Sequence, residues 1–543
     1  MKIRLKKLIA VLLAVVMLVP IGALAGYAAT CSCPNTPYVY VYGQQWLWVT
    51  EEDGTRHAPL EEDSYDIPAI AKALAPVLFK AIQTDDWTEY GEALYNVMAP
   101  TYAELKVDGN GFPINANTGI EHKWDYASVS GAHYRHMGEP HIYRFDSRLS
   151  PMDVADDMHA YIEAVKEKTG HDKVNIVSRC LGCSYVMAYL YKYERENNYS
   201  GVNRLILLNG TQNGTTWLNA VFTGNIEIDA DSLVRFLHTS ESLTGELDSN
   251  ISELLFLTVD MLSETYSINR VIDIIQRMYD KIKDTAIAPI IREYYGTCGG
   301  YLAMLTDGFD EAIDYIFPTE ADKAAYAGVI AKAKDYNDNV LLKNDEILLE
   351  MDAASVPVFT IVEYGYQQYP VAGEQSALVA DNTIGVVEQS FGATVSKVDS
   401  TLSQEYIDAQ TAAGLGKYIS ADKQIDASTC LFPERTWFIK NLNHQFPNEI
   451  HVMVNYLAFT ADAPTIDSNP AYPQFMNCTK RADGYEYFVP LQETNAEDVD
   501  WAAIEDTKGA ATAEFFKRIL NFFKNFIQYI IEAIKSIVDQ ATE

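Results

Sequence analysis

Basic side chains are scarce in this sequence. Its 543 residues include 41 lysines and arginines against 75 aspartates and glutamates, so the formal net charge is -34 at pH 7. A surface of this sign repels phosphate backbones and anionic lipid headgroups. The composition therefore argues against a nucleic-acid partner, and beyond that it bears on solubility rather than on function.

Histidine and cysteine are also few. The seven cysteines are an odd number, so in an exported protein at least one thiol stays unpaired or pairs with another chain. Four of the ten histidines, His122, His133, His136 and His141, lie close together in a loop-rich stretch. They lack the tightly spaced ligand pair with a carboxylate on one helix that a metal site needs. We therefore expect no metal and no cofactor, and we interpret these histidines as loop residues near the mouth of a site.

The first 29 residues predict export. A basic start is followed by an almost wholly apolar stretch, 8–24, and then by small residues up to Ala29. This order is typical of a cleaved secretory signal. Pro20 and Gly22 interrupt the apolar stretch, which is short for a membrane span. We expect a secreted protein, either free or associated with the cell surface.

The remaining chain predicts a mixed α/β fold. Strands alternate with helices from 140 to 210, as in right-handed crossovers that build a mostly parallel sheet flanked by helices. The pattern then changes to helix upon helix from 214 to about 350, and a buried strand returns in "SVPVFTIVEYG", 355–365. An all-helical stretch inside such an alternation indicates an inserted cap, the type of element that covers a site and selects ligands.

These patterns divide the chain into six segments. They are a signal peptide (1–29), the first part of an α/β core (30–213), a helical cap (214–350), the second part of the core (351–490), an acidic linker (491–511) and an amphipathic helical tail (512–543). The tail carries phenylalanine and isoleucine over more than half of its girth. It packs on the body or on a second copy of the chain, or it lies on a membrane surface through its apolar face, and the sequence leaves both open.

The stretch "KVNIVSRCLGCSYVMAYLYKY", 173–193, predicts a strand, a tight turn and a helix, with Cys180 at the apex of the turn. A nucleophile held in such a strained turn needs small residues two positions before and two after it, so that strand and helix can approach. Ser178 and Gly182 meet this requirement. The helix that follows directs its amide dipoles at the nucleophile, which favours a thiolate.

Two backbone amides are expected to face Cys180 as an oxyanion hole. The amide of Leu181 is the first, because it begins the helix after the nucleophile. The second is expected from Gln44 or Gln45, directly after the strand "PYVYVYG". Trp46 and Trp48 follow in the same segment, and with an aromatic-rich cap they favour an apolar ligand.

A nucleophile of this type also needs an acid and a histidine later in the chain, in that order. Asp381 is the candidate acid, because Asn382 after it tolerates a left-handed turn. Glu363, at the end of the preceding strand, is the rival. His444 lies in a loop, "IKNLNHQFPNE", and is the candidate base, whereas His451 falls in the next apolar helix and is expected to pack there.

Four segments together resemble the α/β-hydrolase lipases, and especially their lecithin:cholesterol acyltransferase-like branch. These are Phe145-Asp146-Ser147-Arg148, the turn from Ser178 to Cys183, Asp381-Asn382-Thr383-Ile384, and His444. The resemblance extends over about residues 36 to 460 and is strongest over 140–210. It implies an α/β-hydrolase fold with Cys180, Asp381 and His444 as a triad that cleaves esters or thioesters of an apolar acyl or lipid substrate.

The sequence departs from the pattern of that family at several positions. Cys180 replaces the usual serine, Arg179 the usual histidine, Cys183 a glycine, and Ser147 a tryptophan. Some hydrolases of this fold, such as the dienelactone hydrolases, do use cysteine. Two alternatives stay open: an inactive binding protein with the hydrolase fold, and a thiol–disulfide protein that uses the pair Cys180 and Cys183.

Overall fold

The computed structural model describes most of the chain between residues 31 and 493. The described residues are 31, 35–45, 47–59, 67–121, 123–132, 141–229, 232–233, 236, 268–306, 308–444, 446–481 and 483–493. The predicted signal segment and tail lie outside them, as does most of the predicted linker. None of the helices within these ranges combines the length and the apolar character that crossing a membrane requires.

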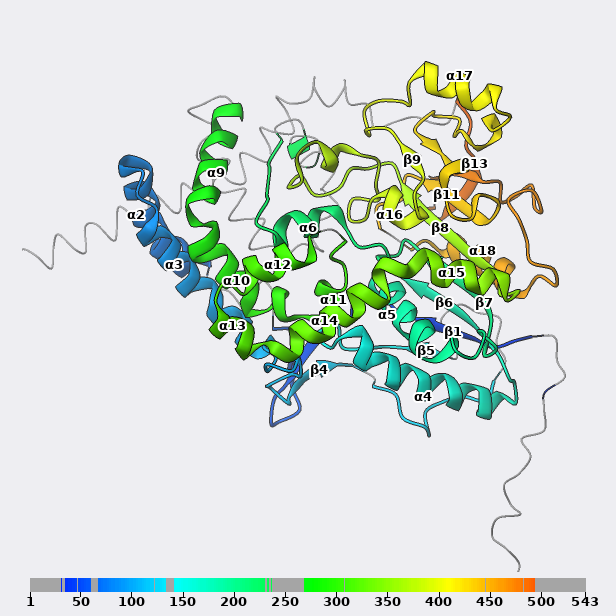
Figure 1. The fold of residues 1–543 in the computed structure, drawn as a ribbon, viewed down its shortest axis with the longest axis horizontal. Coiled ribbons are helices and arrows are strands. Elements are labelled where there is room, and N and C mark those ends of the chain that lie inside the picture. The colour runs from blue at the N-terminus through cyan, green and yellow to red at the C-terminus, as the bar shows by residue number, and fades with distance from the viewer. Residues whose placement is uncertain are drawn as a thin grey trace, which may run out of the picture.

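An eight-stranded sheet forms the centre of the protein (Figure 1). In spatial order its strands are β13 (Glu486–Pro490), β12 (Phe475–Lys480), β11 (Thr436–Lys440), β8 (Val358–Tyr364), β7 (Val202–Leu208), β6 (Val174–Arg179), β1 (Tyr38–Val41) and β5 (Ile142–Tyr143). All neighbours pair in parallel except β12 and β13, which form an antiparallel hairpin. The prediction of a mixed α/β fold with a mostly parallel sheet is therefore confirmed.

The sheet is the middle of three layers. Helices α4 (Pro151–Thr169) and α5 (Leu181–Tyr189) share one apolar cluster with Ile176 of β6, whereas α18 (Asn448–Phe459) shares another with Val177 of the same strand. Successive side chains of a strand point to opposite faces, so one strand serves both clusters. Because both faces of the sheet are covered, β6 and its neighbours β1 and β7 are buried along most of their length.

Helix α4 follows the signals in its sequence. The side chain of Ser150 accepts a hydrogen bond from the amide of Met152, and Pro151 occupies the first helical position. The helix ends at Gly170, whose φ of 68° lies in the left-handed region. These caps fix the point at which the chain enters β6, the strand that carries Cys180.

The described residues between β7 and β8 are helical, and we refer to this segment as the cap. Its helices are α6 (Thr216–Phe222), α9 (Ile268–Ile282), α10 (Ala288–Glu293), α11 (Gly299–Leu302), α12 (Phe309–Ile316), α13 (Glu320–Ala325), α14 (Ala327–Asn339) and α15 (Asn344–Ala353). Short turns η6 (Lys283–Ile287), η7 (Tyr295–Thr297) and η8 (Leu341–Lys343) join them.

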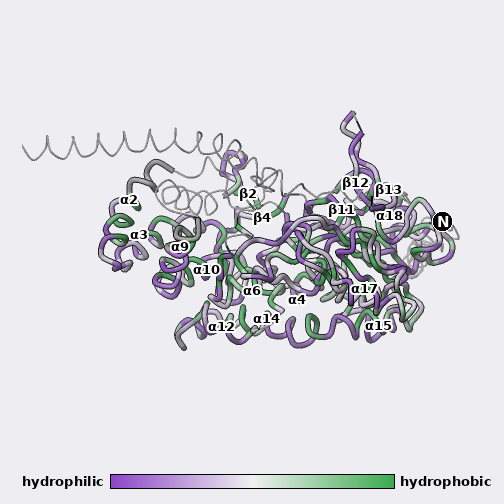
Figure 2. The backbone as a smooth tube through the Cα atoms, turned by 90° about the horizontal axis from the view of Figure 1, so that it is seen from above, coloured by the Kyte–Doolittle hydropathy of each residue, from purple (hydrophilic) through white to green (hydrophobic). Residues whose placement is uncertain are grey.

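Two N-terminal helices lie against the cap rather than against the sheet. Helices α2 (Ile67–Thr84) and α3 (Thr88–Met98), with the turn η3 (Ala99–Leu105), lie beside α9 and α10 (Figure 1). Figure 2 shows this group at one end of an elongated molecule, with β12, β13 and α18 at the other. A separate antiparallel sheet has the order β3 (Arg56–His57), β2 (Leu47–Thr50), β4 (Thr118–Ile120).

The segment between β8 and β11 is irregular and carries the candidate acid. Its elements are η9 (Gly373–Ala377), α16 (Val386–Ser390), β9 (Thr394–Val395), α17 (Gln404–Ala412), η10 (Gly416–Tyr418), β10 (Ile425–Asp426), η11 (Ala427–Thr429) and η12 (Pro433–Arg435). Outside this segment, between β6 and β7, a π-helical turn, η4 (Leu190–Glu194), extends α5. The buried ammonium of Lys440 lies 3.0 Å from the buried carboxylate of Asp422 and so ties the end of β11 to this segment.

Candidate active site

Cys180 occupies a strained turn between β6 and α5. Its φ of 51° and ψ of -132° lie in a region that costs a non-glycine residue free energy, and such strain is found where the surroundings fix the backbone. Three hydrogen bonds fix it here: the Cys180 amide donates to Leu208 O (3.0 Å), and the amides of Cys183 (3.0 Å) and Thr211 (3.2 Å) donate to Cys180 O. The strand–turn–helix arrangement predicted around Cys180 is therefore present.

The small residues around Cys180 have the steric role that the sequence predicts. A Cβ at Gly182 would overlap the carbonyl oxygen of Tyr42 and would lie 3.0 Å from Ser178 Oγ. A Cβ at Gly43 would lie 3.1 Å from the Cβ of Cys180 and 3.6 Å from its Sγ. The loop after β1 thus passes directly beside the thiol, and this close approach needs glycine at position 43.

Asp381 and His444 meet although 63 residues separate them in the chain. Nδ1 of His444 lies 2.8 Å from Oδ2 of Asp381, and both side chains are buried. Asp381 Oδ1 accepts hydrogen bonds from the amides of Thr383 (2.9 Å) and Ile384 (2.6 Å), so the carboxylate is oriented by its own turn. Asn382 has a φ of 79°, the left-handed conformation that the sequence predicted.

Electrostatics favour a thiolate at Cys180 and an imidazolium at His444. Burial by itself raises the pKa of Cys180, but the charge and hydrogen bond of His444 and the charge of Arg179 reverse this and hold the pKa below its usual value. Burial lowers the pKa of His444, but Cys180 and Asp381 together raise it well above the ordinary value. A cysteine and a histidine that stabilise each other's charged forms are the arrangement of an activated thiol nucleophile.

Arg179 holds the loop that carries His444. Its guanidinium donates a hydrogen bond from Nη2 to the carbonyl oxygen of His444 at 3.0 Å, and it lies over the ring of Phe446 at 4.8 Å. His444 itself has a φ of 59°, so its backbone depends on such support. The sequence showed Arg179 only as a departure from the family pattern, and its contact with the histidine loop becomes visible only in the fold.

The cap reaches the start of α5 through α11. The amides of Gly299 and Gly300 donate to Arg148 O and Ser147 O, each at 2.9 Å. A Cβ at Gly300 would lie 3.1 Å from Leu181 Cδ2, so the cap contacts the first residue of the nucleophile's helix. Tyr301, the next residue, accepts a hydrogen bond from Gln44 Nε2 at 2.9 Å.

Leu181 directly follows Cys180, and Gln44 directly follows Gly43, which lies beside Cys180; the role of their amides as an oxyanion hole stays a prediction. The Leu181 amide contributes to the low pKa of the Cys180 thiol, as a donor facing the sulfur would. Gln44 follows Gly43 and is held by Tyr301, while Gln45 bonds to the carbonyl oxygen of Gly43 at 3.1 Å. The contact of Tyr301 with Gln44 was not predicted from the sequence. The one indication of it was the Gly299-Gly300 pair directly before Tyr301, since adjacent glycines indicate a close approach of the backbone to another segment.

Of the two tryptophans predicted to bind substrate, only Trp48 lies within the described residues, and its role stays a prediction. Trp48 lies in β2 of the small antiparallel sheet, opposite Gly119, and Trp46 lies outside the described residues. The tryptophan that reaches the acid turn comes from the cap, because Trp217 of α6 donates from Nε1 to Thr383 O at 2.8 Å. The position of Trp48 is set by pairing with β4, which residue spacing after β1 did not reveal.

Cys183 points away from the chemistry of Cys180. It is fully buried, its Sγ faces Leu208 O at 3.9 Å, and burial raises the pKa of its thiol to about 12. Cys180 and Cys183 are both free thiols, as are Cys298, Cys430 and Cys478. A thiol this strongly protonated is a poor partner in thiol–disulfide exchange.

The histidines near residue 130 do not form a site in the described part of the chain. His141 is buried, with Nε2 3.2 Å from Ala132 O, so it packs inside the protein and does not line a mouth as expected. His122, His133 and His136 lie outside the described residues. A different group, Glu363, Asp381 and His444, brings ligand-type atoms within 4.8 Å of one another. A cation there would have to break the hydrogen bond between His444 and Asp381.

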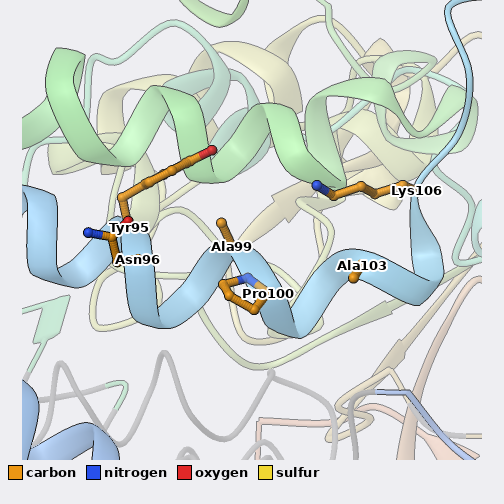
Figure 3. A pocket seen from close by; sticks show the side chains of 6 residues that line it. All are labelled: Tyr95, Asn96, Ala99, Pro100, Ala103 and Lys106. Carbon is orange, nitrogen blue, oxygen red and sulfur yellow. The ribbon is translucent and has the colours of Figure 1, made fainter.

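A pocket of about 230 Å³ lies apart from the triad, along α3 and η3 (Figure 3). Figure 3 shows Tyr95 and Lys106 reaching from this segment toward the helix above it. Both engage Glu293 of α10: the Tyr95 hydroxyl donates to it at 2.8 Å, and Lys106 forms an ion pair with it. The hydroxyl of Tyr95 and the ammonium of Lys106 thus serve the packing of this segment on the cap.

No protein-family model matches the chain, and no curated protein matches it in sequence.

Proposed function

We propose that the protein is a hydrolase of the α/β-hydrolase fold that cleaves carboxylic esters or thioesters of an apolar acyl substrate through Cys180, His444 and Asp381. The observation that carries this proposal is the position of His444, with Nδ1 2.8 Å from Oδ2 of Asp381 and the ring close enough to Cys180 to lower the pKa of its thiol. A nucleophile, a base and an orienting acid in contact are the requirement for nucleophilic acyl transfer.

The topology supports the same assignment. Cys180 follows β6, Asp381 lies in the segment after β8, and His444 follows β11. These strands are close neighbours in one parallel sheet, so the carboxyl ends that lead to the three residues meet at one edge. The chain order nucleophile, acid, histidine is the order of the α/β-hydrolases.

The reaction follows from the charges at the site. The Cys180 thiolate attacks the acyl carbonyl carbon and forms a C–S bond, while the negative charge that develops on the carbonyl oxygen is stabilised by the Leu181 amide and a donor of the Gln44 loop. The His444 imidazolium protonates the departing alkoxide or thiolate. Neutral His444 then takes a proton from water, the hydroxide attacks the thioester, and the acid and the thiolate are released. An acceptor alcohol in place of water would give acyl transfer.

The two alternatives are less well supported. A binding protein has no need to bury Asp381 and His444 in contact, since buried ionisable groups cost stability unless they are paired for a purpose. A thiol–disulfide protein would need Cys183 to be reactive, and this thiol is fully buried with a raised pKa. The apolar residues of the cap favour an apolar acyl group over a charged one.

The test is the rate at which iodoacetamide alkylates Cys180 as a function of pH, followed by peptide mass mapping. We expect the pH of half-maximal rate to lie below that of an ordinary thiol in the wild type and to move to higher pH in His444→Ala, because the imidazolium then no longer opposes the effect of burial. Cys183→Ala is the control and should follow the wild-type curve. A wild-type midpoint that equals the one in His444→Ala would overturn the proposed pair.

Turnover is measured on the same preparations. With acyl thioesters and 4-nitrophenyl esters of different chain length, Cys180→Ala should lose at least about a thousandfold in kcat/KM. Cys180→Ser should retain part of the activity, because a serine in the same turn faces the same histidine. Hydrolysis by Cys180→Ala at the wild-type rate would exclude Cys180 as the nucleophile.

We also propose that the protein is exported, because its N-terminal sequence has the order of a secretory signal. Determining the N-terminus of the protein recovered from the culture medium tests this. A start between residues 26 and 30 is expected, and an intact N-terminus on protein found only inside the cell would contradict it.

A further inference from the structure

Glu363 is a buried carboxyl beside the triad that the proposed reaction does not use. It is the last residue but one of β8, it is 1% exposed, and neither of its carboxyl oxygens has a hydrogen-bond partner in the described structure. Ligand-type atoms of Glu363, Asp381 and His444 lie within 4.8 Å of one another. A buried polar group without a hydrogen-bond partner is rare in folded proteins, and such groups often have a functional role.

The backbone of Glu363 is fixed by hydrogen bonds at both its amide and its carbonyl oxygen. Its amide donates to Gln389 Oε1 at 2.9 Å, and Gln389 Nε2 donates to Glu363 O at 3.2 Å. Pairing of β8 with β11 places Glu363 opposite Ile439. The sheet therefore fixes the backbone position from which this buried carboxyl extends.

Groups from four other elements face this carboxyl. They are Asp381 from the segment after β8, His444 from the loop after β11, Arg179 from the end of β6, and Asn209 from the end of β7, while the Cys478 thiol of β12 also interacts with it. Burial first, and then the charge of Asp381, raise the pKa of Glu363 to about 8, against the opposing influence of His444 and Arg179. Near neutral pH the carboxyl is therefore protonated.

Protonation balances the buried charges. The thiolate of Cys180 and the carboxylate of Asp381 are offset by His444 and Arg179, so an ionised Glu363 would add one uncompensated negative charge. The buried side-chain amide of Asn209 faces the carboxyl and, as a hydrogen-bond donor, lowers the pKa of Glu363, which makes its ionisation at alkaline pH easier.

We propose that Glu363 is a positioning residue of the site, a second carboxyl whose ionisation stabilises the imidazolium of His444 and so extends the working range of the site toward alkaline pH. This inference rests on the proposed function, because it acts through the histidine of that reaction. The leaving group is protonated by the imidazolium, so the rate falls at high pH once His444 loses its proton. A negative charge on Glu363 opposes that loss, because an opposite charge within a few ångströms favours the charged form of histidine.

The experiment is an NMR titration of His444 in protein with 13C-labelled histidine, in the wild type, in Glu363→Gln and in Glu388→Gln. Glutamine keeps the shape of Glu363 and cannot ionise. We expect Glu363→Gln to lower the pKa of His444 by roughly one pH unit or more, and the alkaline limb of kcat/KM to move to lower pH by the same amount. Glu388→Gln, on α16 at the neighbouring turn, is the matched control and should leave both unchanged.

The titration also separates this inference from the proposed reaction. In a Cys180→Ala background no turnover is possible, yet adding Glu363→Gln to that background should still lower the pKa of His444. The wild type alone should show the His444 resonance shifting near pH 8 as Glu363 ionises, which keeps the test valid if Glu363→Gln fails to fold. A His444 titration that is the same with and without the Glu363 carboxyl would overturn the inference.

Discussion

The sheet and the cap contribute to the site by different means. Cys180, Asp381 and His444 follow strands whose positions are fixed by backbone pairing, and the backbone of Cys180 and His444 is held at positive φ. The cap meets the same site through single side-chain bonds, from Tyr301 to Gln44 and from Trp217 to the acid turn. Under the proposed function, this difference leads us to expect the chemistry to depend on the core and the choice of substrate on the cap.

Among the changes that leave Cys180 in place, the largest effect is expected from Asp381→Asn, which alters a residue held by the sheet. His444 loses its orienting carboxylate, so kcat/KM should fall by about a hundredfold or more. Glu363 lies close enough to supply part of the missing charge, and the removal of the Asp381 charge makes its ionisation easier. We therefore expect the double variant Asp381→Asn/Glu363→Gln to fall further, by about tenfold.

Steady-state kinetics with one thioester substrate, measured for both single variants and the double variant, checks this expectation. Asp422→Asn removes a buried carboxylate that pairs with Lys440 outside the triad, and it serves as the control for general effects on the fold. A double variant as active as Asp381→Asn alone would show that Glu363 does not compensate.

A smaller effect concerns the stability of the core and depends on pH. The pKa of Glu363 in the folded protein is about 8, above the value of about 4.3 for an exposed glutamate. Between these values the unfolded chain has lost a proton that the folded chain keeps, so the free energy of unfolding falls as the pH rises through this window. Glutamine at position 363 cannot ionise, so the variant does not lose stability over this pH window. Glu363→Gln should therefore have a free energy of unfolding higher than that of the wild type by roughly 2 to 4 kcal/mol at pH 8, and by much less at pH 5.

Urea unfolding of the wild type and of Glu363→Gln at pH 5 and pH 8 measures the difference. Glu388→Gln, which removes a half-buried carboxylate, should show little change between the two pH values. A gain in stability that is the same at both pH values would mean that Glu363 is already ionised in the folded protein.

The smallest effect is expected in the cap. Tyr301→Phe removes the acceptor of Gln44 while keeping the ring, so the loop after β1 loses its contact with the cap and kcat/KM should fall by about tenfold. Tyr295→Phe is the matched control, because its ring packs on Tyr301 with centroids 5.4 Å apart but does not contact Gln44. Equal kinetics for the two variants would mean that the cap takes no part in positioning the oxyanion donors.

The sequence predicts those parts of the site that depend on local structure. An apolar strand followed by small residues and an apolar helix allows only a tight turn, so the position of Cys180 could be inferred from about twenty residues. Asn382 after Asp381 predicted a left-handed turn for the same reason. The position of Trp48 could not be inferred in this way, because nearness in sequence to the loop at Gly43 does not determine the pairing of β2 with β4.

The sequence by itself determined the alternation of strands and helices, the turn at Cys180 and the candidates for its partners, because each of these depends on residues within one or two elements. Only the tertiary structure decided which carboxyl meets His444, that Arg179 holds the histidine loop, and that Glu363 is buried beside the pair. These outcomes depend on the order of β6, β7, β8 and β11 in the sheet. Contacts between residues tens to hundreds of positions apart are set by that order, which local sequence patterns do not contain.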